Sequence, residues 1–190
     1  LFLRGTGVTL LIAITGTLLG FLLGLLVAIA RTIELSPHAG VVKRALVKLL
    51  HAVLSIYIEV FRGTPMIVQA MVIYYGALQY LNIDMPRLVA AIFIVSINTG
   101  AYMAEIIRGG IISIDKGQTE AATSIGLTHW QTMTSVVLPQ AIRNIMPSIG
   151  NEFVVNIKDS SVLNVISVTE LFFQAKSATG TYFKYFEVYF

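Results

Sequence analysis

The sequence has no cysteine and very little charge. The lack of cysteine excludes a disulfide framework, a thiolate metal site and a cysteine nucleophile. Charged residues make up 12% of the 190 residues, about half the share found in a typical soluble domain. A chain that is also 56% hydrophobic cannot cover a water-facing surface, and it is too apolar for intrinsic disorder. With a mean hydropathy of +0.79, it is expected to be a membrane protein.

Long apolar runs divide the chain into expected membrane spans. The run Gly5–Ala30 holds no charge and is longer than the ~20 residues that cross a bilayer core. Its glycines recur every four residues, which predicts a ridge that lets another helix pack closely: Gly16, Gly20 and Gly24. The next three spans are expected at His51–Leu81, which Pro65 must bend or break, Leu88–Ile112 and Ala141–Val168.

The last part of the chain is more polar. We expect a loop over Thr169–Lys184 and the start of a fifth membrane helix at Tyr185–Phe190, with its remainder beyond Phe190. The sequence therefore predicts an all-α polytopic membrane protein with about five transmembrane helices, the fifth cut short.

Basic residues give the orientation of the spans. Seven of them border the two links that we assign to the cytoplasm: Arg31, Lys43, Arg44, Lys48, Arg108, Lys116 and Arg143. Four lie on the other side: Arg4, Arg87, Lys176 and Lys184. Because cytoplasmic loops carry the excess of positive charge, this bias places the N-terminus outside and residues 113–140 inside.

The stretch Ser113–Gln140 has more pattern than a plain connector needs. Glu120, Ala121 and Ala122 favour a helix, and Gly126 supplies freedom for a sharp turn. Leu127–Val137 is expected to form a second short helix that Pro139 ends. A DNA-binding helix-turn-helix is excluded because Arg143 is the only lysine or arginine from Glu120 to Arg143.

This pattern resembles the EAA loop of ABC importer permeases: Glu-Ala-Ala at 120–122, Gly126, then Val136-Val137-Leu138-Pro139. Three further blocks resemble the polar amino acid uptake branch of that family and occur in the same order: Ile58–Pro65, Ala101–Gly110 and Gly150–Ser161. The departures are small, with Val136 in place of a common isoleucine and Ser160-Ser161 in place of Thr-Ser.

The resemblance implies that residues 1–190 are a type I ABC importer transmembrane domain, incomplete at both ends, with the coupling loop at 113–140. It implies four kinds of partner: cytoplasmic ATPase subunits, a second permease subunit in a homodimer or heterodimer, an extracytoplasmic binding protein or fused binding domain, and the lipid bilayer of a prokaryotic plasma (inner) membrane. No nucleic acid is expected. The chain itself is expected to bind no cofactor, since it has no phosphate-binding Gly-x-x-x-x-Gly-Lys-Ser/Thr loop, so the partner ATPase would bind ATP and magnesium.

The coupling loop is the predicted docking element for the ATPase. A short helix seated in a groove of the partner can move with it as one body, and Glu120 is available for a basic partner side chain. The residues assigned to this coupling role are Glu120, Ala121, Ala122, Gly126 and Leu127. The alternative is that Glu120 only supports its own helix.

Ionisable groups at membrane depth are costly, so they are functional candidates by default. Glu152, Asn156 and Asp159 share one helical face, and Asn98, Tyr102 and Glu105 repeat this spacing. We expect the two stripes to face each other across a polar cavity for a solute. Lys158, Ser160 and Ser161 would suit a carboxylate, and Glu152 or Asp159 an ammonium. The alternative is that these charges pair with each other or with Glu105 and Arg108.

A gate or hinge is the second candidate within the spans. Glu59 and Arg62 are three residues apart on a helix that Gly63-Thr64-Pro65 interrupts. A local Glu59–Arg62 ion pair is the simpler interpretation of the same residues.

The expected function is the permease subunit of an ATP-driven importer that works by alternating access. Four acids against three bases within the spans favour a neutral polar amino acid such as glutamine, or a cationic one such as arginine or histidine. Alternatives are another small polar solute such as cystine, or a channel that needs no ATP. An enzyme is not expected, because no histidine lies beside a serine or paired acid in the spans.

Overall fold

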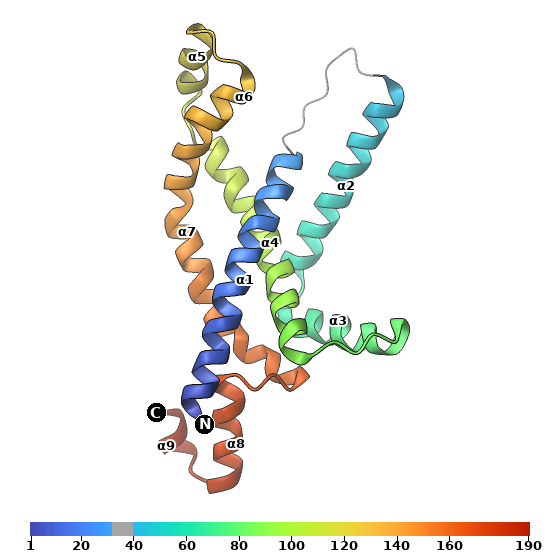
Figure 1. The fold of residues 1–190 in the computed structure, drawn as a ribbon, viewed down its shortest axis with the longest axis vertical. Coiled ribbons are helices and arrows are strands. Elements are labelled where there is room, and N and C mark those ends of the chain that lie inside the picture. The colour runs from blue at the N-terminus through green and yellow to red at the C-terminus, as the bar shows by residue number, and fades with distance from the viewer. Residues whose placement is uncertain (32–39) are drawn as a thin grey trace.

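Four long helices run along the molecule, and shorter helical pieces lie at both ends (Figure 1). The computed structural model describes residues 1–31 and 40–190. The long helices are α1 (Phe2–Arg31), α2 (Val41–Gly63), α4 (Arg87–Ile112) and α7 (Leu138–Asp159). The shorter pieces are α3 (Met66–Leu81), α5 (Lys116–Ser124), α6 (His129–Thr132), the π-helix η1 (Met133–Val137), the 3₁₀ helix η2 (Ser160–Ile166), α8 (Leu171–Tyr182) and α9 (Tyr185–Tyr189). The described residues contain no strand, which confirms the all-α prediction.

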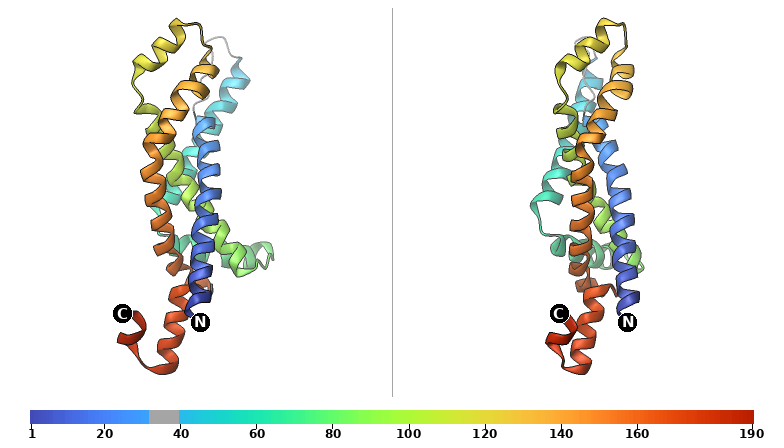
Figure 2. Two further views of the ribbon diagram at one scale, coloured as in Figure 1. Left: turned by 60° about the vertical axis from the view of Figure 1, so that its left-hand side comes forward. Right: turned by 90° about the vertical axis from the view of Figure 1, so that its left-hand side faces the viewer.

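The two ends of the molecule carry different parts of the chain (Figure 2). α5 and α6 lie at the same end as the start of α2, whereas α8, α9 and both termini lie at the other end. The chain therefore alternates between ends in the predicted order, with residues 113–140 opposite the N-terminus.

α1 and α4 pack through the predicted glycine ridge. A Cβ added to Gly16 would lie 2.5 Å from Val95 Cγ1, and one added to Gly20 would lie 2.6 Å from Thr99 Cβ. At Gly24 the added atom would lie 2.5 Å from the Cβ of Met103. The partners on α4 are also four residues apart, so one ridge lies along the other and only glycine leaves room for it. We call this contact the α1–α4 seam.

Among the described residues, two helices are long and apolar enough to cross a membrane: α1 and α4. α3 is apolar but shorter, and the charged residues of α2 and α7 lower their hydropathy. Away from the seam, α1 exposes a band of large aliphatic side chains, which suits contact with lipid: Leu10, Leu11, Ile14, Leu18, Leu22 and Leu26.

The expected second span is two helices in the structure. α2 begins ten residues before His51 and ends at Gly63, and α3 starts at Met66 and lies across the bundle (Figure 1). The break falls where Pro65 was expected to cause one. Pro65 has no N–H, and its ψ of 138° directs the chain away from the axis of α2.

The loop predicted over Thr169–Lys184 is wrong, because α8 occupies most of it. Glu170 caps this helix: its carboxylate accepts hydrogen bonds from the backbone N–H groups of Phe172 and Phe173 at 2.8 and 2.6 Å. Glu170 is almost completely buried, and burial raises the pKa of its carboxyl, while the two N–H donors act in the opposite direction. Residues 171–182 thus form a helix because Glu170 binds the free N–H groups at its start and because the helix packs on α1.

The expectation that Pro139 ends a short helix is also wrong. α6 begins at a capping box formed by Thr128 and Gln131, continues through the π-helical turn η1 and joins α7 without a break. Pro139 is the second residue of α7. A proline is tolerated there because the widened π-turn before it has already shifted the hydrogen-bonding pattern of the backbone.

Candidate functional site

A polar pocket of about 420 Å³ lies between α4, α7 and the corner that joins α2 to α3. Of the residues predicted to bind solute, it brings together Asn98 and Tyr102 from α4 with Glu152 and Asp159 from α7. Two of the predicted hinge residues, Thr64 and Pro65, form a further wall, and Asn151, Met66 and Val155 complete the lining. The two stripes and the corner therefore meet at one cavity, which we call the central pocket.

The two acids of the central pocket form no ion pair within the part of the chain that the structure describes. Glu152 is nearly buried and Asp159 half-buried, and neither forms an ion pair with any residue in the described ranges 1–31 and 40–190. Each carboxylate lies on the same face of α7, one at each side of Asn156. The pocket thus offers two hydrogen-bond acceptors of negative charge, which suit an ammonium or guanidinium group.

Glu105, the third member of the α4 stripe, lies elsewhere. Its carboxylate pairs with Arg31 at the end of α1 and with Arg108 one turn further on, at 2.9 Å. This three-residue cluster joins α1 to α4 at the end that carries α5 and α6. Arg31 and Arg108 are therefore committed to Glu105 and not to the acids of the pocket.

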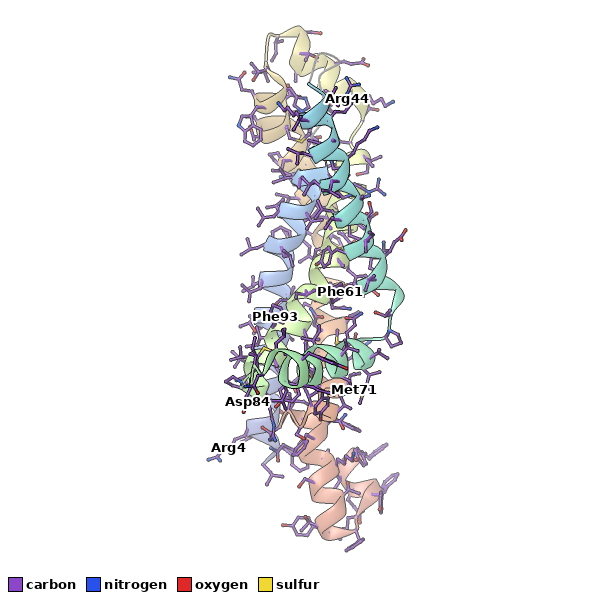
Figure 3. The ribbon with its side chains drawn as sticks, turned by 90° about the vertical axis from the view of Figure 1, so that its right-hand side faces the viewer. Arg4, Arg44, Phe61, Met71, Asp84 and Phe93 are labelled. Atoms are coloured by element: carbon purple, nitrogen blue, oxygen red, sulfur yellow. The ribbon has the colours of Figure 1, made fainter. Side chains whose placement is uncertain are left out.

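The corner itself is held by side-chain amides. Asn98 Nδ2 donates to the backbone oxygen of Phe61 at 3.0 Å and to Gln69 Oε1 at 2.9 Å. Gln69 Nε2 donates to the backbone oxygens of Phe61 and Thr64, each at 2.9 Å. Figure 3 shows Phe61 at the end of α2, next to α3. Gln69 was not predicted; its signal is a polar residue four places after Pro65 in an otherwise apolar run.

Arg62 contacts an aromatic ring and not Glu59. Its guanidinium carbon lies 5.4 Å from the ring centroid of Tyr102, within range of a cation–π contact. No Glu59–Arg62 ion pair is present in the part of the chain that the structure describes, so the simpler interpretation of these two residues is wrong. The reason is that Tyr102 on α4 offers the guanidinium a partner at the rim of the pocket.

Asn156 joins three helices and does not line the central pocket. Its Nδ2 donates to Thr17 Oγ1 on α1 at 2.9 Å, and its Oδ1 accepts from Thr99 Oγ1 on α4 at 3.0 Å. All three side chains are buried. The triad links α7 to the α1–α4 seam at the level of Gly20, which packs on the same Thr99.

The remaining predicted solute residues line a second pocket of about 360 Å³ nearer the termini. Lys158, Ser160 and Ser161 lie there with Glu170 and Phe2. Ser160 and Ser161 donate their hydroxyl protons to the backbone oxygens of Ile157 and Lys158. Successive residues of a helix are about 100° apart, so Lys158 departs from the face that carries Asp159.

The predicted coupling loop is a compact helical knob. Asp115 caps α5 by accepting the N–H of Gly117 at 2.7 Å, and Ala122 is buried beneath the helix while Glu120 and Ala121 are exposed. The chain reverses at Gly126, whose φ of +86° lies in the left-handed region. The N–H groups of Gly126 and Leu127 donate to the backbone oxygens of Thr123 and Ala122 and close the end of the helix.

Two large apolar side chains flank this turn on the outside. Ile125 is 79% and Trp130 67% exposed, although neither lies in a membrane-facing run. They adjoin Glu120 and Gly126 in the sequence and were not predicted as site residues; Trp130 is the only tryptophan of the chain. A charged and apolar knob of this kind suits a protein surface better than water.

No cluster of three acidic or histidine side chains that could hold a metal ion occurs within residues 1–31 and 40–190. The chemistry available at the central pocket is therefore hydrogen bonding and charge, from two carboxylates, the amides of Asn98 and Asn151, the hydroxyl of Thr64 and the phenol of Tyr102.

Helices that pack through small residues, a polar pocket within the bundle and a helical knob at one end define a membrane permease. Residues 20–181 match the model of the family described as binding-protein-dependent transport system inner membrane component. The chain belongs to this family.

Individual relatives agree with this assignment. The chain is 38% identical over 194 aligned residues to the glutamine transport system permease protein GlnP of Escherichia coli K12, covering 100% of this chain and 81% of the relative. It is 34% identical over 185 residues to the arginine transport system permease protein ArtQ of Bacillus subtilis 168, covering 97% and 79%.

Solved structures share the fold. The crystal structure of an amino acid ABC transporter with histidines superposes with a TM-score of 0.86 at 39% identity, covering 99% of this chain and 82% of that one. An inward-facing conformation of the MetNI methionine ABC transporter gives a TM-score of 0.75 at 19% identity, over 94% and 80% of the two chains. The second likeness supports the fold alone.

Proposed function

We propose that the chain is the membrane-spanning subunit of an ATP-driven importer of amino acids in a prokaryotic plasma membrane. The observation that carries this proposal is the central pocket, where Glu152 and Asp159 lie with Asn98 and Tyr102 and form no ion pair with any described residue. The relatives named for glutamine and arginine transport support an amino acid as solute. The permease itself hydrolyses no ATP; partner ATPase subunits supply that step.

The charge of the central pocket favours a cationic amino acid over an acidic one. Glu105 is paired with Arg31 and Arg108, and Arg62 lies over the ring of Tyr102. Glu59 and Lys158 do not line the pocket, so the charged side chains of its lining are the carboxylates of Glu152 and Asp159. An ammonium or guanidinium group would lie between them, and Tyr102 and Asn151 would contact the rest of the solute. A neutral polar amino acid such as glutamine would still offer its α-ammonium group to the same acids.

The knob formed by α5 and α6 is the proposed docking element for the ATPase. Its rigid cap, its turn at Gly126 and its exposed Ile125 and Trp130 suit a groove on a soluble partner. η1 and α7 continue directly from α6, so a movement of the knob reaches Glu152 and Asp159 along one helical rod. ATP-driven closure of the partners would reorient the pocket in this way and give alternating access.

Uptake by the reconstituted transporter tests the solute role. Permease, ATPase subunits and binding protein are placed in proteoliposomes, and uptake of radiolabelled arginine and glutamine is measured with and without ATP. We expect ATP-dependent uptake, which E152Q and D159N lower while the exposed-site control E187Q leaves it unchanged. Uptake that continues without ATP would indicate a channel, and accumulation of cystine but neither amino acid would indicate the other solute class.

The same preparation tests the coupling role. We expect E120K and G126P to assemble with the ATPase in the membrane but to lose the rise in ATP hydrolysis that the loaded binding protein causes. E187K makes the same charge reversal at an exposed position outside the knob and serves as the control. Wild-type stimulation in both E120K and G126P would refute the docking role of this knob.

A further inference from the structure

The corner between α2 and α3 contains a hydrogen-bonding defect that the fold must repair. In an uninterrupted helix the backbone oxygen of Phe61 would accept the N–H of residue 65, but residue 65 is proline and has no N–H. The oxygen of Thr64 is also left without a helical donor, because α3 starts anew after Pro65. Phe61 is half-buried, and the bonds that its oxygen and that of Thr64 accept are partly buried, so both oxygens gain from a donor within the protein.

Gln69 and Asn98 supply the missing donors. Phe61 O accepts from both side-chain amides, at 2.9 Å from Gln69 Nε2 and 3.0 Å from Asn98 Nδ2. Gln69 Nε2 also reaches the backbone and hydroxyl oxygens of Thr64, both at 2.9 Å. Gln69 and Asn98 are both more than nine-tenths buried, so the bond between them is shielded from water, whereas those to Phe61 and Thr64 are partly buried.

The backbone oxygens fix which way both amides point. A carbonyl oxygen only accepts, so the atom of each amide next to Phe61 O must be its nitrogen. The oxygen of Gln69 is then free to accept the second hydrogen of Asn98 Nδ2, as observed at 2.9 Å. Both donor hydrogens of Asn98 are now used, and its oxygen is the only hydrogen-bonding atom left to face a ligand.

Asn98 is also a wall of the central pocket. With its donors occupied, it adds one more acceptor to those of Glu152 and Asp159. Thr64, on the same wall, donates its hydroxyl to Val60 O at 2.7 Å and is likewise left without a free donor. These four side chains thus present acceptors alone to a solute group between them, and the donors of the lining come from Tyr102 and Asn151.

We propose that Gln69 is a positioning residue for solute selection: it completes the Pro65 corner and locks the Asn98 amide with its oxygen available, so that the pocket favours groups that donate hydrogen bonds, ammonium and guanidinium. This inference rests on the proposed transport function. Without Gln69, one N–H of Asn98 still binds Phe61 O but the other loses its acceptor and becomes available to the pocket, which weakens the preference for a donor-rich cation.

Direct binding measures this preference independently of the binding protein. The permease–ATPase complex is placed in nanodiscs, and radiolabelled arginine and glutamine are titrated by equilibrium dialysis. Q69M keeps the length of the side chain and removes its hydrogen bonds. The matched control is Q79M, on the same helix but exposed. We expect Q69M to raise the Kd of arginine by roughly three- to ten-fold, the size of one lost hydrogen bond, with a smaller change for glutamine.

A second variant, Q69E, separates the two roles of Gln69, which are to hold the Asn98 amide in place and to stabilise the Pro65 corner. In Q69E the carboxylate still accepts from Asn98 but cannot donate to Phe61 or Thr64, so the corner loosens while Asn98 keeps its orientation. We expect Q69E and Q69M to lower the melting temperature alike, but only Q69M to lower the preference for arginine over glutamine. An equal loss of preference in both, or none in Q69M relative to Q79M, would overturn the inference. A wild-type complex that binds neither amino acid would instead refute the proposed function.

Discussion

The two sides of α4 make opposite kinds of contact. Toward α1 it forms the α1–α4 seam, in which glycines lie directly on Val95, Thr99 and Met103. Toward α2 and α3 it packs more sparsely. Small apolar groups meet there, such as Ile58 of α2 with Ala104, and polar bonds add to them, such as Tyr57 Oη to Ile97 O at 2.6 Å and Asn98 to the Pro65 corner. One side is closely packed over several turns, and the other is held at a few points and encloses a pocket.

The difference indicates which parts move together. A seam in which backbones approach closely has many dispersion contacts and no alternative register, so α1 and α4 are expected to behave as one rigid unit. A corner held by directional bonds can exchange those bonds for others at small cost in free energy. Rearrangement during transport is therefore expected at the α2–α3 corner and along α7, against a fixed α1–α4 pair.

The largest expected effect comes from filling the seam. G20A adds a Cβ that would lie 2.6 Å from Thr99 Cβ, a distance that requires the two helices to separate. Overpacking of this kind costs about 1–3 kcal/mol of unfolding free energy, and thermal unfolding of the purified permease in detergent measures it.

The control for this variant lies on the same helix. Gly7 is exposed, and an added Cβ there would have no neighbour within 4 Å. G7A should therefore be neutral or raise stability by up to about 1 kcal/mol, because alanine favours a helix over glycine. If G20A melts no lower than G7A, the seam is not the rigid element that we describe.

A smaller effect is expected where the seam meets the wall of the central pocket. N156L removes the bonds to Thr17 and Thr99 and should cost about 1 kcal/mol, since hydrogen bonds between membrane helices contribute little more than this. N144L, at an exposed position of α7, is the control for stability.

The same variant separates the two possible roles of Asn156. Because both polar atoms of its amide bind side chains of other helices and it does not line the central pocket, we expect N156L to lower the melting temperature but to leave the Kd of arginine unchanged. A higher Kd of arginine at an unchanged melting temperature would mean that Asn156 contacts the solute. The α1–α4 seam and the central pocket would then not be separate at this residue.

The features that the sequence could predict are those that follow from the spacing of residues within one helix. The spacing of Gly16, Gly20 and Gly24 is a property of one helix, and so is the shared face of Glu152 and Asp159; both features are found in the structure. The family resemblance located the knob at residues 113–140 in the same way, from a pattern within one segment.

The features that the sequence could not predict depend on contacts between segments that are far apart in the chain. The role of Gln69 depends on Asn98, 29 residues away, and the role of Asn156 depends on Thr17, 139 residues away. α8 was missed because its cap is a glutamate whose burial against α1 no local pattern reveals. Lys158 was grouped with the pocket by its charge, although its place on the helix directs it to the other cavity.

The smallest expected effect lies at the N-terminal end of α1, outside the α1–α4 seam, where α8 packs on α1. Leu171 donates its N–H to Thr9 Oγ1 at 3.2 Å, and an added Cβ on Gly5 would lie 2.9 Å from Leu171 Cα. Burial raises the pKa of Glu170, the cap of this helix, so the folded protein keeps the carboxyl proton to a higher pH than the unfolded chain does.

The unfolding free energy should therefore fall as the pH rises from the ordinary pKa of a glutamate to the raised pKa of Glu170, because the unfolded state loses its proton first. E170Q keeps an oxygen that can cap α8 but does not titrate, so it should flatten this slope when melting temperatures are compared across the acidic range. E187Q removes an exposed carboxylate and should leave the slope as it is. An unchanged slope in E170Q would mean that α8 is not held against α1 tightly enough to bury its cap. The close packing of α1 would then end before Gly5.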